Sequence, residues 1–260
     1  MSSRSTNPAG AASGLWLGRI GSLGLMLAGW ALAARLLDDP LTLPSPGSVA
    51  GFMVREWASG ALPHNLLATL GRVAASFALA MSAGLALGLA MGRHRRLDSW
   101  LDNLLIVLLN LPALVTIVLC YIWIGLNETA AITAVALNKI PMVTVMIREG
   151  ARALDPQLDA LVRIHRPSRI VVLRDVLLPQ LAPQIAAAGR AGLALIWKIV
   201  LVVEFLGRSD GVGFQIHLGF EMFDVRQILG YALSFVAVML LIEAAVLRPW
   251  ELRANHWRLA

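Results

Sequence analysis

Several stretches of the chain run for about the length of a bilayer crossing with few or no charged side chains. Residues 20–34, 73–92 and 103–127 carry none, and residues 129–147, 176–206 and 227–247 carry one to three. A helix needs roughly 20 apolar residues to span the hydrocarbon core. Only helices and closed barrels satisfy their backbone groups in lipid. The sequence therefore predicts an all-α, polytopic membrane protein with about six transmembrane helices.

The composition agrees with this prediction. Charged residues make up 15% of the chain and hydrophobic residues 58%, whereas soluble domains carry about 25% charged residues. The net charge of +6 lies in short loops beside apolar runs, which indicates membrane topology and argues against nucleic-acid binding. The single cysteine, Cys120, allows no disulfide within the chain. Because the five histidines are scattered, we expect no metal site.

The arginines of the loops orient the predicted helices. With the N-terminus in the cytoplasm, the inner segments hold Arg93, Arg95, Arg96, Arg148, Arg152, Arg248, Arg253, Arg258 and the arginines of residues 155–183. The opposite side holds only Arg55, Arg208 and Arg226. Because cytoplasmic loops are enriched in Lys and Arg, we expect both termini to be cytoplasmic and residues 155–183 to form the longest inner loop.

This loop has a helical pattern interrupted by prolines. Asp155 and Pro156 favour a helix start, and Leu158, Leu161, Val162 and His165 then recur on one helix face. We expect Pro167 to end this helix, Ser168 to cap a second one, and Pro179 and Pro183 to break the second one before the next span. These residues suit a helix pair on anionic lipid and a docking helix in a groove of a cytosolic subunit equally well.

A resemblance to a known family favours the docking helix over the helix pair on lipid. The loop frame ALDP (153–156), SR (168–169) and VLLPQLAP (176–183) resembles the cytoplasmic "EAA" loop of ATP-binding-cassette importer permeases. The wider chain resembles their nitrate/sulfonate/taurine branch, through LPSPGSV (43–49), HNLLATLGRVAASFALAMSAGLALGLAMG (64–92), YIWIGLNE (121–128), LIWKIVLVVEFLG (195–207) and GVG (211–213). These matches occur in order along nearly the whole chain.

The resemblance implies a type I importer architecture and a set of partners. These are a second permease copy (a homodimer), two cytosolic ATPases and a periplasmic solute-binding protein, in a bacterial inner membrane. It implies that the loop docks on the ATPase through Leu158, Ala160, Leu161, Val162, Arg163, His165, Arg166 and Pro167. Members of this family usually have an acidic residue, two alanines and then a glycine in the loop. At those four positions this chain has Ala160, Leu161, Val162 and Arg166.

The chain lacks a nucleotide site of its own. It contains no G-x-x-x-x-G-K-[ST] motif, and its two lysines, Lys139 and Lys198, lie outside any glycine-rich loop. We therefore expect a permease subunit that is not an enzyme and holds no cofactor. ATP and Mg²⁺ would be bound by the partner ATPase.

Five ionisable residues lie within apolar stretches and are functional candidates, because each is costly to bury in lipid. They are Arg72, Lys139, Arg190, Lys198 and Glu204. We expect Lys139, Lys198 and Glu204 to line the translocation pathway, where a lysine would suit an anionic solute such as a sulfonate or nitrate. The alternative is structural: Glu204 pairs with Lys139 or with another helix, and Arg72 and Arg190 extend to an interface. We expect Glu243 to pair with Arg248.

These predictions divide the chain into two parts. Residues 1–13 are expected to be a disordered cytoplasmic N-terminus, and residues 14–260 a single transmembrane domain with a coupling loop at about 148–183. Residues 20–34 also match a signal peptide, but we interpret them as a retained first span. Two other functions stay open, an ion-driven secondary transporter and a membrane scaffold that does not transport. The sequence does not identify the substrate.

Overall fold

The computed structural model of the chain describes residues 8–155, 157, 162, 164, 165, 167–247 and 249. This part of the chain is helical and contains no strand, as the sequence predicted. In chain order the elements are α1 (Pro8–Leu37), α2 (Pro46–Ala58), α3 (Ala61–Arg93), α4 (Arg95–Asn110), α5 (Ala113–Ile124), α6 (Glu128–Arg152), α8 (Arg169–Val171), η1 (Val172–Leu177), α9 (Leu178–Gly207), α10 (Val212–Glu221), α11 (Val225–Ile242) and η2 (Glu243–Leu247).

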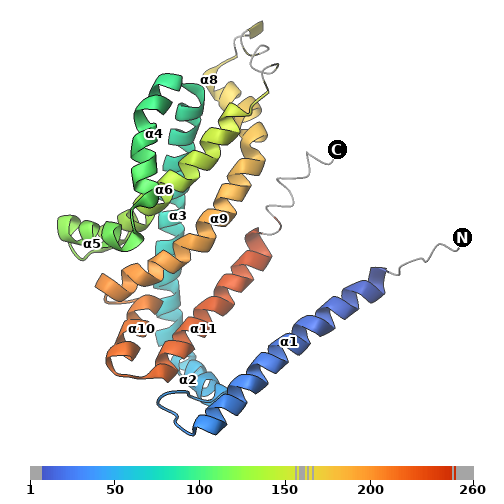
Figure 1. Cartoon of the computed structure of the whole chain (residues 1–260), viewed down its shortest axis with the longest axis vertical. Coiled ribbons are helices and arrows are strands. Elements are labelled where there is room, and N and C mark those ends of the chain that lie inside the picture. The colour runs from blue at the N-terminus through green and yellow to red at the C-terminus, as the bar shows by residue number, and fades with distance from the viewer. Residues whose placement is uncertain are drawn as a thin grey trace, which may run out of the picture.

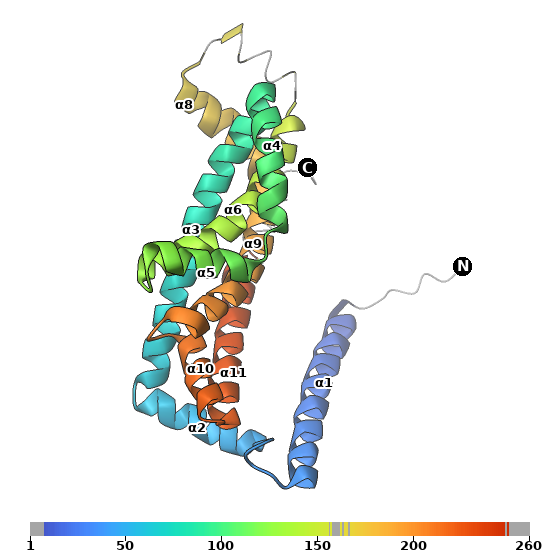
Figure 2. The ribbon, with the colours of Figure 1, turned by 60° about the vertical axis from the view of Figure 1, so that its left-hand side comes forward.

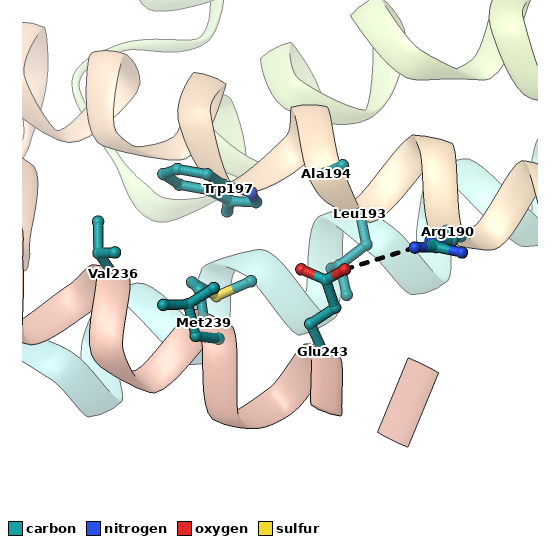
Figure 3. A pocket seen from close by; sticks show the side chains of 8 residues that line it. Arg190, Leu193, Ala194, Trp197, Val236, Met239 and Glu243 are labelled. Atoms are coloured by element: carbon teal, nitrogen blue, oxygen red, sulfur yellow. Dashed lines mark ion pairs between the residues drawn. The ribbon is translucent and has the colours of Figure 1, made fainter. Parts of the chain in front are cut away.

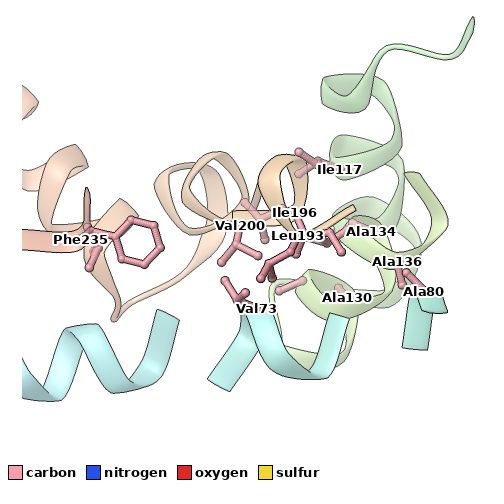
Figure 4. Close-up of a cluster of buried hydrophobic side chains, with 14 of the residues drawn as sticks. Val73, Ala80, Ile117, Ala130, Ala134, Ala136, Leu193, Ile196, Val200 and Phe235 are labelled. Atoms are coloured by element: carbon pink, nitrogen blue, oxygen red, sulfur yellow. The ribbon is translucent and has the colours of Figure 1, made fainter. Parts of the chain in front are cut away.

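The centre of the bundle is formed by α3, α6 and α9, which pack against one another (Figure 1). Alanines and branched aliphatic residues fill the space between them, with Val73 and Ala80 on α3, Ala134 on α6 and Val200 on α9 all buried (Figure 4). Helices in a membrane approach closely where their contact residues are small. This core therefore sets the positions of the polar residues that the same three helices carry.

A glycine stripe on α3 makes the closest of these approaches. Gly84, Gly88 and Gly92 recur every fourth residue and face α6. A Cβ atom on Gly88 would lie 2.6 Å from the carbonyl oxygen of Thr144. Only glycine fits such a backbone contact without movement, so these residues hold α3 and α6 together along the half of the bundle near the start of α4.

Four helices among the described residues are long and apolar enough to cross a membrane: Ala61–Arg93, Glu128–Arg152, Val172–Gly207 and Val225–Ala245. A bent pair, α4 with α5, adds up to one more, and Gly21–Leu37 is a shorter apolar helix. With the bent pair and the shorter helix, the apolar segments number six, in agreement with the approximate count from the sequence.

The apolar stretch at residues 103–127 forms two helices that are interrupted at Pro112. Helices α4 and α5 meet at a bend of 99°. The bend lies at Leu111 and Pro112, whose backbones are extended (ψ of 123° and 135°). Proline disfavours helical geometry in the residue before it and cannot donate a backbone hydrogen bond. Pro112 therefore redirects the chain instead of merely kinking one helix.

The expectation that Pro179 and Pro183 break the chain before the next span is wrong. Helicity continues from α8 through η1 into α9, with Pro179 in the first turn of α9 and Pro183 inside it. Proline is tolerated in a first turn. The preceding turns are π-helical, and the N–H of Leu178 donates to the carbonyl of Leu173, five residues back. This wider winding lets the helix pass Pro179 without ending.

Helix α1 stands apart from the bundle in both views (Figures 1 and 2). It is connected through α2, and the indole N–H of Trp30 donates to the carbonyl of Pro44 at 3.0 Å. Ser45 caps α2, with its Oγ accepting from the N–H of Ser48. Helices α2 and α10 lie at one end of the bundle, and α8 lies at the opposite end with the start of α4 (Figure 2).

The glycine stripe yields a stability prediction. Gly88→Ala is expected to lower stability by about 1–3 kcal/mol, because the added methyl group overpacks a backbone contact. Thermal unfolding of the purified protein in lipid nanodiscs measures the change.

Gly71→Ala on the same helix is the matched control. Its Cβ would meet nothing within 4 Å, and alanine is the better helix former, so its melting temperature should stay level or rise slightly. Equal losses in both variants would contradict the proposed close packing of α3 on α6.

Candidate functional site

A buried guanidinium joins four segments of the bundle. The side chain of Arg72 on α3 is 4% exposed. Its Nε donates to Oε1 of Glu128 at 2.8 Å, its Nη1 to Oε1 of Glu204 at 2.7 Å, and its Nη2 to Oδ1 of Asp210 at 2.5 Å. Glu128 begins α6, Glu204 lies near the end of α9, and Asp210 follows α9. We name these four residues, with Arg208, the Arg72 cluster.

Glu204 is fully buried, and its second carboxylate oxygen is also bonded. Oε2 of Glu204 accepts from Oγ1 of Thr69 at 2.9 Å and from the N–H of Gly213 at 2.8 Å. The backbone of the turn before α10 is held as well, since the N–H of Gly211 donates to Oδ1 of Asn65 at 2.8 Å. A Cβ atom on Gly213 would lie 2.2 Å from a carbonyl oxygen of α9. The GVG turn is therefore fastened directly onto α3 and α9.

The remaining members of the cluster reach the surface. Arg208 contacts Glu128 at 2.9 Å and Asp210 at 3.8 Å. The side chains of Glu128 and Asp210 are 48% and 35% exposed. Three carboxylates face two guanidinium groups, so the cluster is net negative by one charge and its excess charge lies at the exposed rim. The hydroxyl of Tyr121 on α5 donates to the carbonyl of Val203 at 2.8 Å and adds α5 to the same assembly.

A second ion cluster joins α4 to the last turns of α6. Nη1 of Arg148 lies 2.5 Å from Oδ1 of Asp102 and 3.2 Å from Oδ1 of Asp98. Arg152 pairs with Asp98 and, at 2.9 Å, with Glu149. We name these five residues the Arg148 cluster. Because α6 ends at Arg152, these ion pairs join α4 to the residues that directly precede the following loop.

The predicted coupling loop is described only in part. Leu158, Ala160, Leu161, Arg163 and Arg166 lie outside the described residues. Val162 and Pro167 are half-buried and His165 is exposed. Oδ1 of Asp155 accepts from the N–H of Gln157 at 2.8 Å, and Oγ of Ser168 accepts from the N–H of Val171 at 3.4 Å, as expected of two helix starts. The docking role of the loop stays a prediction.

The three predicted pathway residues are not brought together. Glu204 pairs with Arg72 on α3, which confirms the alternative of a partner on another helix. The alternative pairing with Lys139 is wrong, and so is the expectation that Arg72 extends to an interface. Lys139 is half-buried on α6, and Lys198 is exposed on α9 with Nζ 5.5 Å from the centroid of the Trp197 ring. Whether these residues line a pathway stays a prediction.

Arg190 and Glu243 form an ion pair that was not predicted from the sequence. Nη2 of Arg190 lies 3.5 Å from Oε1 of Glu243, and the two side chains point toward each other across a cavity (Figure 3). The expected partner of Glu243, Arg248, lies outside the described residues. The available signal was that α9 and α11 run in opposite directions, which places the start of one beside the end of the other. By this rule Arg190, near the start of α9, would lie beside Glu243, which follows α11.

Comparisons with known proteins agree with this architecture. Residues 80–247 match the family described as "binding-protein-dependent transport system inner membrane component". The taurine transport system permease protein TauC of Escherichia coli K12 is 26% identical, over 92% of this chain and 88% of that protein. The putative aliphatic sulfonates transport permease protein SsuC of Bacillus subtilis is 27% identical, over 83% and 78%. The inward-facing MetNI methionine ABC transporter shares the fold, with a TM-score of 0.62, 17% identity and coverage of 75% and 98%.

The Arg72 cluster yields a second prediction. Arg72→Met is expected to lower stability by about 3–5 kcal/mol, because it leaves the carboxylate of Glu204 buried and unpaired. Adding Glu204→Leu should restore part of that loss, since the uncompensated buried charge is then removed. Thermal unfolding in nanodiscs measures both.

Arg226→Met serves as the control for loss of an arginine. Its side chain is 45% exposed and lies 3.9 Å from Asp224, so its removal should cost under about 1 kcal/mol. A double variant that is less stable than Arg72→Met alone would contradict the account of the cluster.

Proposed function

The chain belongs to the family of binding-protein-dependent transport system inner membrane components, and we propose that it moves a small anionic solute into the cell as the permease of an ATP-driven importer. The family match covers more than half of the chain, and the relatives align over most of their own length. The chain is therefore an importer permease subunit embedded in a membrane. The solute, the coupling and the subunit composition are the proposed parts.

The proposal of an anionic solute rests on two observations. The relatives named above are described as permeases for taurine and for aliphatic sulfonates, both of which carry a sulfonate group. The two lysines of this chain lie within the membrane-spanning helices α6 and α9, where a charge is costly without a functional reason. We assign Lys198 and Lys139 to the solute path. Glu204 contributes to the wall of that path, since its carboxylate binds the backbone of the turn before α10 and pairs with Arg72 on α3.

The proposed assembly contains two copies of this chain, two cytosolic ATPases and a periplasmic binding protein, in the inner membrane with both termini cytoplasmic. ATP and Mg²⁺ bind to the ATPase. The loop at 155–168, with Leu158, Ala160, Leu161, Val162, Arg163, His165, Arg166 and Pro167, docks on that partner. The loop lies between α6 and the continuous helix formed by α8, η1 and α9.

Closure of the ATPase pair on ATP would displace this loop, and its two flanking helices would move with it. The Arg148 cluster extends the movement to α4. The tight α3–α6 contact carries it along the bundle. Packed helices shift as rigid bodies more readily than they deform, so alternating access follows from a tilt of the bundle as a unit.

Coupling is tested by deletion of residues 158–165. This change is expected to release the ATPase from the permease on affinity purification, because it removes the proposed docking helix. Deletion of residues 2–9, the same length of chain at the N-terminus, should leave copurification unchanged. Copurification that survives the loop deletion would place docking elsewhere. Uptake that continues in cells without the ATPase would favour ion-driven transport.

The solute path is tested at Lys198. Lys198→Met is expected to lower ATP-dependent uptake by at least about tenfold, equivalent to ~1.4 kcal/mol, because the cation that meets the anion is lost. Lys198→Arg keeps the charge and should retain most uptake. Copurification of the ATPase should be normal in both variants. Uptake by Lys198→Met at the unmodified rate would remove this residue from the path.

A further inference from the structure

Helices α9 and α11 face each other across a cavity lined by matching stripes. On α9 the stripe is Arg190, Leu193, Ala194 and Trp197, and on α11 and η2 it runs from Val236 to Glu243 at the same spacing. Residues at i, i+3, i+4 and i+7 share one helix face. The two backbones are not closely packed along this seam, so the stripes line a partly open cavity of about 120 Å³ (Figure 3).

One end of the cavity is charged. The ion pair between Arg190 and Glu243 has a contact of 3.5 Å, and its side chains are 43% and 40% exposed. The contacts of Arg72 with Glu128 and Glu204 are 2.7–2.8 Å long, in the range of charge-assisted hydrogen bonds. The pair of Arg190 and Glu243 is thus longer and open to the cavity, so a charged ligand can take its place.

The other end is apolar and aromatic. The indole of Trp197 forms one wall and packs on Phe235 with ring centroids 5.7 Å apart. Met239 and Leu193 form the wall between Trp197 and the charged pair (Figure 3). The cavity is small and partly open, so it suits a compact solute. Small ligand sites usually combine such apolar walls with one or two polar anchors.

We propose that this cavity binds a small zwitterion. The acid group of the ligand binds Arg190, its ammonium group binds Glu243, and the short aliphatic linker between them packs against Met239. The inference rests on the proposed transport function and revises its solute class, from a net anion to a solute whose acid group is balanced by an ammonium group. A simple monoanion on Arg190 would leave the carboxylate of Glu243 beside it, with repulsion and an uncompensated charge. A zwitterion compensates both side chains, so the cavity discriminates against plain anions.

The test compares two solutes of the same size and acid group. The full-length protein in nanodiscs is equilibrated with radiolabelled 2-aminoethanesulfonate or with ethanesulfonate, which lacks the ammonium group. The unmodified chain is expected to bind 2-aminoethanesulfonate at least about tenfold more tightly. Glu243→Gln should bring the two affinities within about twofold. Arg190→Gln should abolish binding of both solutes.

Two controls separate recognition from folding. Glu221→Gln removes a carboxylate on α10 that pairs with His217 and should leave both affinities unchanged. Melting temperatures should show that every variant is folded. The change in tryptophan fluorescence on binding should disappear in Trp197→Phe, which locates the ligand in this cavity.

Three results would overturn the inference: no binding by the unmodified chain, equal affinity for the two solutes, or an unchanged preference in a folded Glu243→Gln variant. Each of these is distinct from failure of the proposed function. Copurification with the ATPase and ATP-dependent uptake test that function. If the chain copurifies with the ATPase and supports ATP-dependent uptake but binds the two solutes with equal affinity, it transports its solute without this site.

Discussion

The carboxylate of Glu204 lies where water does not reach it, and Arg72 compensates its charge. Neither residue would be tolerated alone among the apolar side chains of α3 and α9, because an unpaired buried charge is strongly destabilising. The pair therefore fixes the depth of α3 relative to α9. The turn after α9 and the first residue of α6 bind the same guanidinium, so four segments share one electrostatic centre.

The two ion clusters lie at opposite ends of one rigid core. The Arg72 cluster holds the end at which α9 leads into α10, and the Arg148 cluster holds α6 to α4 near the loop that follows α6. Between them the glycine stripe of α3 packs on α6 with no space for a side chain. These contacts join the helices of the core along its length. In the proposed mechanism, they would let the core move as one body when a cytosolic partner displaces the loop at 155–168.

The predictions from sequence succeeded where a local rule applies. Helices at residues 73–92, 129–147 and 227–247 follow from runs of apolar residues that only a helix can place in lipid. The local rule that proline interrupts a helix held at Pro112 and failed at Pro179 and Pro183, because the effect of a proline depends on its surroundings. Pro112 turns the chain by 99°, whereas Pro179 lies in a continuous helix after a π-helical segment. Pattern alone treats these prolines alike.

By itself, the sequence determined the all-helical class, the membrane setting and the family, since these depend on composition and on the order of motifs along the chain. It also identified Arg72, Glu204, Arg190 and Lys198 as unusual, because a charge within an apolar run is unusual wherever it lies. Tertiary structure alone decided the partners: Glu204 with Arg72, 132 residues away, and Arg190 with Glu243. The physical reason is that an ion pair depends on the distance between two side chains, and that distance is set by how the helices pack.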